Sequence, residues 1–140
     1  MRPSISDSPS QFLSHRLVRA IHRDQLDTFG GKRGVRDEAL LDSALEQPQA
    51  TFEGHLLHET VYQQAAAYLF HLVQNHPFVD GDKRVAFAAM DVFLRLNNLR
   101  LQLSDDEAFS LVMKRAVGEM DKSSIAELLR AECQPIQGAD

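Results

Sequence analysis

Cysteine, proline and glycine are scarce in this sequence, and long hydrophobic runs are absent. The single cysteine, Cys133, excludes an internal disulfide framework and a metal site made only of cysteines. With 7 glycines and 5 prolines among 140 residues, few positions interrupt regular structure, which favours long elements. No apolar run approaches the roughly 20 residues of a membrane span, and no signal-peptide pattern opens the chain. We therefore expect a cytoplasmic protein that makes no membrane contact.

Positive charge is also in deficit. The sequence holds 15 Lys and Arg against 20 Asp and Glu, a net charge of −5, which argues against a general nucleic-acid binder. Apolar residues at 44% and charged residues at 25% are ordinary for a folded protein. A chain of this length suits one domain with one core and leaves little room for regulatory domains, so we expect control by a separate partner.

Apolar residues recur at helical spacing through most of the chain, which predicts an all-α fold, a compact single-domain bundle. We expect six helices: one over 11–28, one capped by Asp37 and stopped by Pro48, one over 59–75, one over 82–97, one with a capping box at Ser104 and Glu107, and one with a capping box at Ser124 and Glu127. The two helices over 59–75 and 82–97 are the most apolar and should form the centre of the core.

The remaining segments are short. Residues 47–57 lack a helical pattern and predict a short flap or hairpin, and the strand candidates lie near 51–55 and 100–103. We divide the chain into a disordered arm over 1–8, a domain over 9–132 and a loose tail over 133–140.

The connection between the two most apolar helices carries reactive groups. It consists of His76, Pro77, Phe78, Val79, Asp80, Gly81, Asp82, Lys83 and Arg84. Gly81 lets a ligand approach the backbone closely, next to a helix N-terminus with free N–H groups. Lys83 and Arg84 oppose the helix dipole unless an anion such as phosphate sits there. Asp80 is suited to Mg²⁺, and His76 to taking a proton from a hydroxyl, so the stretch predicts nucleotide-dependent group transfer.

Each residue alone has a plainer interpretation. Asp80 or Asp82 could simply cap the helix, and the dipeptide at His76 could simply reverse the chain. Lys83 and Arg84 could simply be solvated. We favour the chemical interpretation because all of these residues occur together at one helix start.

The stretch resembles the motif of the Fic/Doc superfamily, His-x-Phe-x-[Asp/Glu]-[Gly/Ala]-Asn-[Gly/Lys]-Arg. Six defined positions agree: His76, Phe78, Asp80, Gly81, Lys83 and Arg84. The lysine form resembles the Doc branch, the death-on-curing toxins of type II toxin–antitoxin systems. The similarity extends to residues 30–52 and 93–97, and covers about residues 17–129.

The resemblance implies a helical Fic fold and a set of roles. His76 would deprotonate a target hydroxyl, Asp80 would position Mg²⁺, and Lys83 and Arg84 would hold phosphates. The nucleotide-binding residues it implies are Phe78, Gly81, Asp82, Lys83 and Arg84.

The activity that the resemblance implies depends on the branch. Doc-like proteins transfer the terminal phosphate of ATP to a threonine of elongation factor Tu, which stops translation, and a cognate antitoxin shuts their site. Fic enzymes proper transfer AMP and have glycine where Lys83 stands. We therefore expect a Doc-like protein kinase toxin using ATP and Mg²⁺, with an AMP transferase as the alternative.

Asp82 departs from the family pattern, which usually has Asn here. An ionised carboxylate only accepts hydrogen bonds and would repel phosphates. Either a magnesium ion bound by Asp80 and Asp82 offsets this repulsion, or Asp82 weakens nucleotide binding and the chain is a degenerate binding module. From the sequence we predict that Asp82→Asn raises phosphotransfer.

Other signals are weaker. His55 and His58 have a spacing that metals use, but no third ligand is near, so we interpret them as a surface pair. Ser123 to Glu127 has the spacing of a self-inhibiting Fic helix, but Leu128 stands where Gly or Asn belongs, so we interpret Ser123 or Ser124 as a helix cap. A basic set in the first third is interpreted as a solvated face: Arg16, Arg19, Arg23, Lys32, Arg33 and Arg36.

Overall fold

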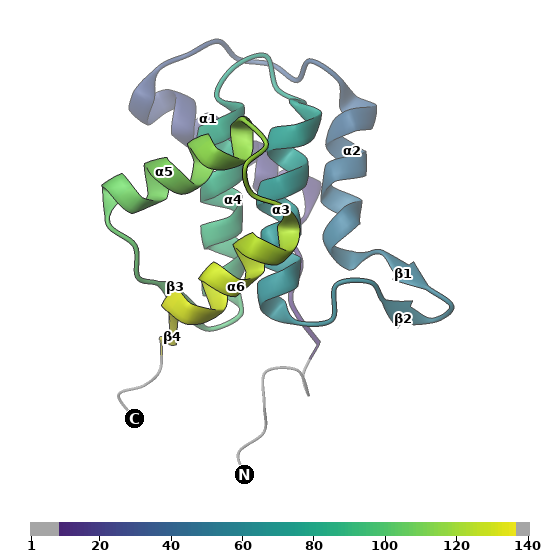
Figure 1. Ribbon diagram of the computed structural model, residues 1–140. Helices are drawn as coiled ribbons and strands as arrows, with labels where there is room; N and C mark the ends of the chain where they lie inside the picture. Colours follow the sequence, from purple (N-terminus) through teal and green to yellow (C-terminus); the bar gives the residue numbers. More distant parts are fainter. Residues whose placement is uncertain (1–8, 137–140) are drawn as a thin grey trace.

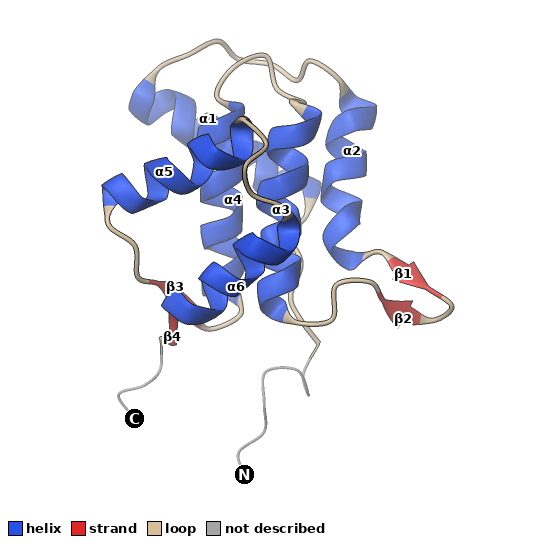
Figure 2. Cartoon of the chain, in the orientation of Figure 1, coloured by secondary structure: helices blue, strands red, loops and turns tan. Residues whose placement is uncertain are grey.

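Six α-helices make up most of residues 9–136, the part of the chain that the computed structural model describes (Figures 1 and 2). They are α1 (His15–Phe29), α2 (Glu38–Glu46), α3 (Val61–Asn75), α4 (Asp82–Leu96), α5 (Asp105–Ala116) and α6 (Lys122–Glu132), with a 3₁₀ turn at Gln47–Gln49. The predicted all-α, single-core bundle is confirmed. The arm predicted over 1–8 and the last four residues of the predicted tail lie outside the described residues.

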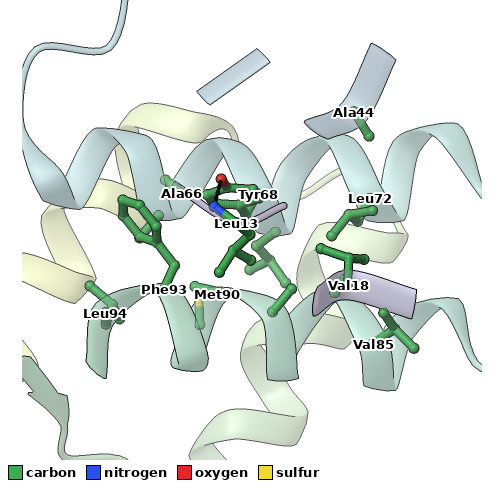
Figure 3. Packing of buried hydrophobic residues seen from close by; sticks show 14 of the residues in the cluster. Leu13, Val18, Ala44, Ala66, Tyr68, Leu72, Val85, Met90, Phe93 and Leu94 are labelled. Atoms are coloured by element: carbon green, nitrogen blue, oxygen red, sulfur yellow. Dashed lines mark hydrogen bonds between the residues drawn. The ribbon is translucent and has the colours of Figure 1, made fainter. Parts of the chain in front are cut away.

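Helices α3 and α4 form the centre of the molecule, as their apolar composition predicts. They run side by side in opposite directions, and α1, α2 and α6 pack around them (Figure 1). Figure 3 shows Tyr68 of α3 against Phe93 of α4, with ring centroids 5.0 Å apart. The Tyr68 hydroxyl also accepts a 2.9 Å hydrogen bond from the Leu13 backbone N–H, which ties the chain before α1 to the core. None of the described helices is both long enough and apolar enough to span a membrane.

The helix ends show where local signals hold and where they fail. Asp37 caps α2 and Ser104 opens α5 with a capping box, both as predicted. The capping box predicted at Ser124 is wrong, because α6 begins at Lys122 and Asp121 is its cap. The Asp121 carboxylate accepts the Ser124 N–H at 2.9 Å, so Ser124 lies inside the first turn. Asp121 offers the stronger cap, an ionised acceptor near the positive end of the helix dipole.

Two small antiparallel pairs complete the fold. The predicted hairpin is present as β1 (Thr51–Phe52) and β2 (His55–Leu56). A second pair joins β3 (Leu99–Leu101) to β4 (Cys133–Pro135), so the prediction of a loose tail from residue 133 is wrong for its first residues. After α6 the chain runs alongside β3, and hydrogen bonds between β3 and β4 satisfy the backbone groups of both strands.

The α1–α2 connection and the loop between α3 and α4 lie at the same end of the bundle, at the top of Figure 1. The β1–β2 hairpin precedes the first residue of α3, and the loop follows its last residue. Fifteen helical residues, about 22 Å of helix axis, therefore separate the two (Figure 1). The hairpin lies away from the loop that carries the motif.

Candidate active site

The α3–α4 connection and the first turn of α4, residues 76–84 and here called the motif loop, are held by the chain between α1 and α2. Val35 and Phe78 form an isolated antiparallel bridge. The Pro77 carbonyl accepts the Arg36 and Asp37 N–H groups at 2.7 and 3.1 Å. A further N–H, that of Val79, donates to the Gly34 carbonyl at 3.0 Å. These backbone hydrogen bonds give the motif loop a fixed path without a sheet of its own.

Phe78 anchors the motif loop in the core. Its side chain is 1% exposed, and its ring stacks on the His22 imidazole with centroids 4.0 Å apart. Nε2 of His22 in turn lies 3.0 Å from the Asp80 carbonyl oxygen. Because protein encloses the ring, the Phe78 side chain positions the loop. The contact of Phe78 with a nucleotide stays a prediction.

His76 stands where α3 ends. Its backbone is left-handed, with φ 50° and ψ 54°, which turns the chain out of the helix. Arg36 stabilises this end by donating from Nε to the His76 carbonyl at 2.8 Å and from Nη2 to the Asn75 carbonyl at 3.0 Å. The His76 side chain is 62% exposed, so a macromolecular substrate has access to it.

Asp82 is the first residue of α4 and points back into the motif loop. Oδ1 accepts the Phe78 N–H at 2.9 Å, and Oδ2 makes an ion-pair contact with Nδ1 of His76. The Asp82 side chain is 6% exposed, and Oδ2 makes no hydrogen bond within residues 9–136. Gly81 is the N-cap residue of α4. The plainer interpretation, in which Asp80 or Asp82 simply caps this helix, is therefore wrong. Magnesium binding by Asp82 stays a prediction; Oδ1 already accepts the Phe78 N–H.

Asp80 is held as an ionised carboxylate. Its oxygens accept the Lys32 N–H at 3.1 Å and the Gly81 N–H at 2.9 Å. These two backbone hydrogen bonds, that from Lys32 first, lower the pKa of Asp80. Among the described residues no group of three or more metal-ligating side chains forms. One ionised carboxylate with unused lone pairs fits Mg²⁺, which typically takes one or two carboxylates together with substrate phosphates.

Gly31 brings the α1–α2 connection against Asp80. Its φ of 128° disfavours any side chain, and a Cβ there would lie 2.8 Å from Cδ2 of Leu26 and 3.0 Å from Oδ2 of Asp80. Only glycine fits without displacing one of these groups. The residue next to it, Lys32, supplies the N–H that holds Asp80.

The start of α4 has the properties of an anion site. Gly81, with φ 81°, begins the helix without any capping side chain, so the first N–H groups remain available there within the described part of the chain. Lys83 is exposed. Arg84 donates from Nη2 to the Gly30 carbonyl at 3.0 Å and lies over the Phe29 ring at 5.4 Å, while its Nε is buried and has no partner among residues 9–136. The start of α4 therefore combines free N–H groups and the positive end of the helix dipole with two basic residues.

Comparison with known proteins places the chain in a family. The model of the family described as "Fic/DOC family" matches residues 12–94. The chain belongs to the Fic/DOC family. Toxin Doc of Mycolicibacterium smegmatis (strain ATCC 700084 / mc(2)155) is 42% identical over 100 residues, which cover 70% of this chain and 77% of that protein. Protein kinase doc of Escherichia phage P1 is 28% identical over 111 residues, 79% of this chain and 86% of that protein.

The basic first third of this Fic/DOC chain borders the motif loop. Arg19, Arg23 and Arg33 line a cavity of about 290 Å³ together with His22. His22 contacts the Asp80 carbonyl, so the cavity adjoins the motif loop. Arg23 and Arg33 are exposed and Arg19 is partly exposed, as expected of a solvated face. Sequence reasoning did not assign residues 30–37 to the site. The clustered glycines and basic residues there were the signal that could have found it.

His55 and His58 do not share a position suited to a metal. His55 lies exposed in β2, whereas Nε2 of His58 lies 3.1 Å from Nζ of Lys122. His71 of α3 contacts the same ammonium at 3.0 Å. We call His58, His71 and Lys122 the histidine–lysine cluster; it joins α6 to α3 and to the segment before α3 in this Fic/DOC chain.

Proposed function

We propose that this protein is a Doc-like toxin that transfers the terminal phosphate of ATP to a serine or threonine hydroxyl of a target protein. The observation that carries the proposal is the motif loop, where the exposed imidazole of His76 stands beside the cationic helix start at Lys83 and Arg84. The relatives support it, since one is named a toxin and the other a protein kinase.

Each residue of the site has its own role in phosphoryl transfer. His76 takes the proton of the target hydroxyl as that oxygen forms its bond to phosphorus and the bond between phosphorus and ADP breaks. Lys83, Arg84 and the free N–H groups of α4 hold the phosphates and oppose their charge. Asp80 is the residue that would hold Mg²⁺, which neutralises phosphate charge when bound.

The proposal extends to a target and a partner, supported by the likeness to Doc proteins. We propose elongation factor Tu as the target and inhibition of translation as the consequence. We also propose a cognate antitoxin as the partner that closes the site, because the exposed His76 has no covering segment within residues 9–136.

The test is the mass of the modified target. Purified chain, ATP and Mg²⁺ are incubated with elongation factor Tu, and intact mass is measured. A gain of about 80 Da is expected for phosphate, whereas about 329 Da would show AMP transfer and replace the kinase by its alternative. His76→Ala is the control and should give no gain. If His76→Ala arrests growth in cells as the native chain does, or if neither protein modifies any target, the enzyme proposal fails.

A further inference from the structure

Arg36 donates hydrogen bonds to three consecutive carbonyl groups around the candidate base. Its Nη2 and Nε donate to the carbonyls of Asn75 and His76 at 3.0 and 2.8 Å, and its backbone N–H donates to that of Pro77 at 2.7 Å. A guanidinium presents its donors in a rigid planar fork, so the two side-chain hydrogen bonds fix two carbonyls relative to each other. The backbone on both sides of the His76 α-carbon is therefore held from one residue of the α1–α2 connection.

The backbone of His76 needs such support. Its φ of 50° and ψ of 54° are left-handed, the region that glycine usually occupies after a helix end. A residue with a Cβ is disfavoured there and persists where its surroundings hold it, as happens at functional sites. No carboxylate among residues 9–136 forms an ion pair with Arg36, and its charge lies at the negative end of the α3 dipole. Arg36 thus stabilises the turn that carries the imidazole.

We propose that Arg36 is a positioning residue that keeps the imidazole of His76 in place to take the proton of the target hydroxyl. The inference rests on the proposed function. In the reaction, that hydroxyl gives its proton to His76 while its oxygen bonds to phosphorus and the bond between phosphorus and ADP breaks. Arg36 exchanges no proton; it acts through the backbone of His76. A displacement of the base by about 1 Å is enough to lower the rate on the order of 10²-fold.

The end of α3 has other ties that do not depend on the Arg36 side chain. The Asp37 N–H donates to the Pro77 carbonyl at 3.1 Å, and the Asn75 amide donates to the Leu40 carbonyl at 2.9 Å. These hydrogen bonds remain when the guanidinium is removed. The Arg36 side chain is also exposed, so its replacement opens no cavity in the core. We therefore expect a folded variant in which the turn at His76 has lost its direct restraint.

The first readout is the split between kcat and KM. Arg36→Met keeps the aliphatic stem and the backbone N–H but removes both side-chain donors. With target and ATP at saturation its kcat is expected to fall on the order of 10²-fold, while KM for ATP stays within about twofold. Arg36→Lys keeps the charge without the fork and should retain more activity than Arg36→Met.

Arg95→Lys is the matched control variant. Nε of Arg95 donates to Oδ2 of Asp91 at 3.1 Å within α4, near the end of that helix that lies away from the motif loop. The same substitution there should leave kcat at the native value. Thermal unfolding of each variant shows that the protein compared is folded.

A double-variant cycle shows whether Arg36 acts through His76. In the background of His76→Gln the base is already lost, so Arg36→Met should reduce the residual rate by less than about twofold. A residue that only stabilises the fold, or that acts on the nucleotide, would reduce the rate by the same factor in both backgrounds.

Crystal structures of the native chain, Arg36→Met and Arg36→Lys give a readout that needs no activity. His76 is expected near φ 50° in the native chain and outside the left-handed region, or in more than one conformation, in Arg36→Met. If Arg36→Met does not fold, the same comparison is made with Arg36→Lys.

Three outcomes overturn the inference: a native kcat in Arg36→Met, an equal loss in the native and His76→Gln backgrounds, or a His76 backbone and imidazole that keep their native positions in the variant structure. Failure of the proposed function looks different, because the native chain would then transfer neither phosphate nor AMP. The crystal structures still decide in that case whether Arg36 positions His76.

Discussion

Two histidines five residues apart, His71 within α3 and His76 just past its end, meet opposite electrostatic surroundings. His76 is exposed and faces the carboxylate of Asp82. His71 is half-buried and faces the ammonium of Lys122 at 3.0 Å. Burial first, and then the positive charge of Lys122, lower the pKa of His71 to about 4.

The difference separates a reactive imidazole from a structural one. The exposed imidazole of His76 is open to a substrate hydroxyl and has a carboxylate, not a cation, beside it. A cationic neighbour and burial keep His71 neutral, so that its lone pair accepts a hydrogen bond from Lys122. Residue type alone does not assign chemistry; burial and the sign of the nearest charge separate these two histidines.

The largest expected effect tests this contrast in activity. His76→Gln should reduce phosphotransfer about 10²- to 10⁴-fold, the contribution of a general base. His71→Gln should leave kcat within about twofold, because a glutamine oxygen can still accept from Lys122. Initial rates of target phosphorylation at saturating ATP measure both. Equal losses in the two variants would remove the distinction.

The second prediction concerns stability and pH. Because the native state holds His71 neutral, the unfolded chain binds more protons between pH 4 and 6.5. The stabilisation that depends on neutral His71 is therefore fully present above pH 6.5. It falls as pH drops through this window and is lost below pH 4. We expect a loss of about 2–3 kcal/mol in the free energy of unfolding. His58, whose pKa is lowered by burial and by Lys122, acts in the same direction.

Urea unfolding between pH 8 and 4 measures this loss. Carboxylates titrate near the acid end, so the native chain is compared with His71→Gln at each pH. The difference between the two curves isolates the histidine, and it should shrink as pH falls. A difference that is constant with pH would contradict the neutral state of His71.

The two regions also differ in what the sequence reveals. The residues of the motif loop stand within nine consecutive positions, and the helices around it have a 3.6-residue pattern, so both were predicted. The supports of the loop were not, because the bridge between Val35 and Phe78 joins segments distant in the chain. His71 and Lys122, 51 residues apart, leave no local pattern either. For α6 the sequence reasoning named only the serines as caps, whereas Asp121 is the cap in the structure.

The third prediction tests the support of the motif loop. Gly30 and Gly31 both have positive φ, but a Cβ at Gly30 meets nothing within 4 Å, whereas one at Gly31 strikes Leu26 and Asp80. Each alanine variant carries the backbone penalty, about 1–2 kcal/mol. Gly31→Ala should cost about 1–2 kcal/mol more and also reduce phosphotransfer, because Asp80 must move. Thermal unfolding and initial rates check both variants. Equal stability and equal activity of the two would show that the close approach is not required.

The smallest expected effect concerns Lys122. Burial, the largest cause of the low pKa of His71, remains in Lys122→Met, while the cationic cause is removed. The pKa of His71 should rise only part of the way, so the acid loss of stability shrinks by about 1 kcal/mol. The matched control is Lys114→Met, an exposed lysine of α5, which should leave the pH dependence unchanged. Urea midpoints at pH 7.5 and 4.5 compare the variants. If both lysine variants keep the native pH dependence, burial alone holds His71 neutral, and the contrast with His76 is one of exposure and not of charge.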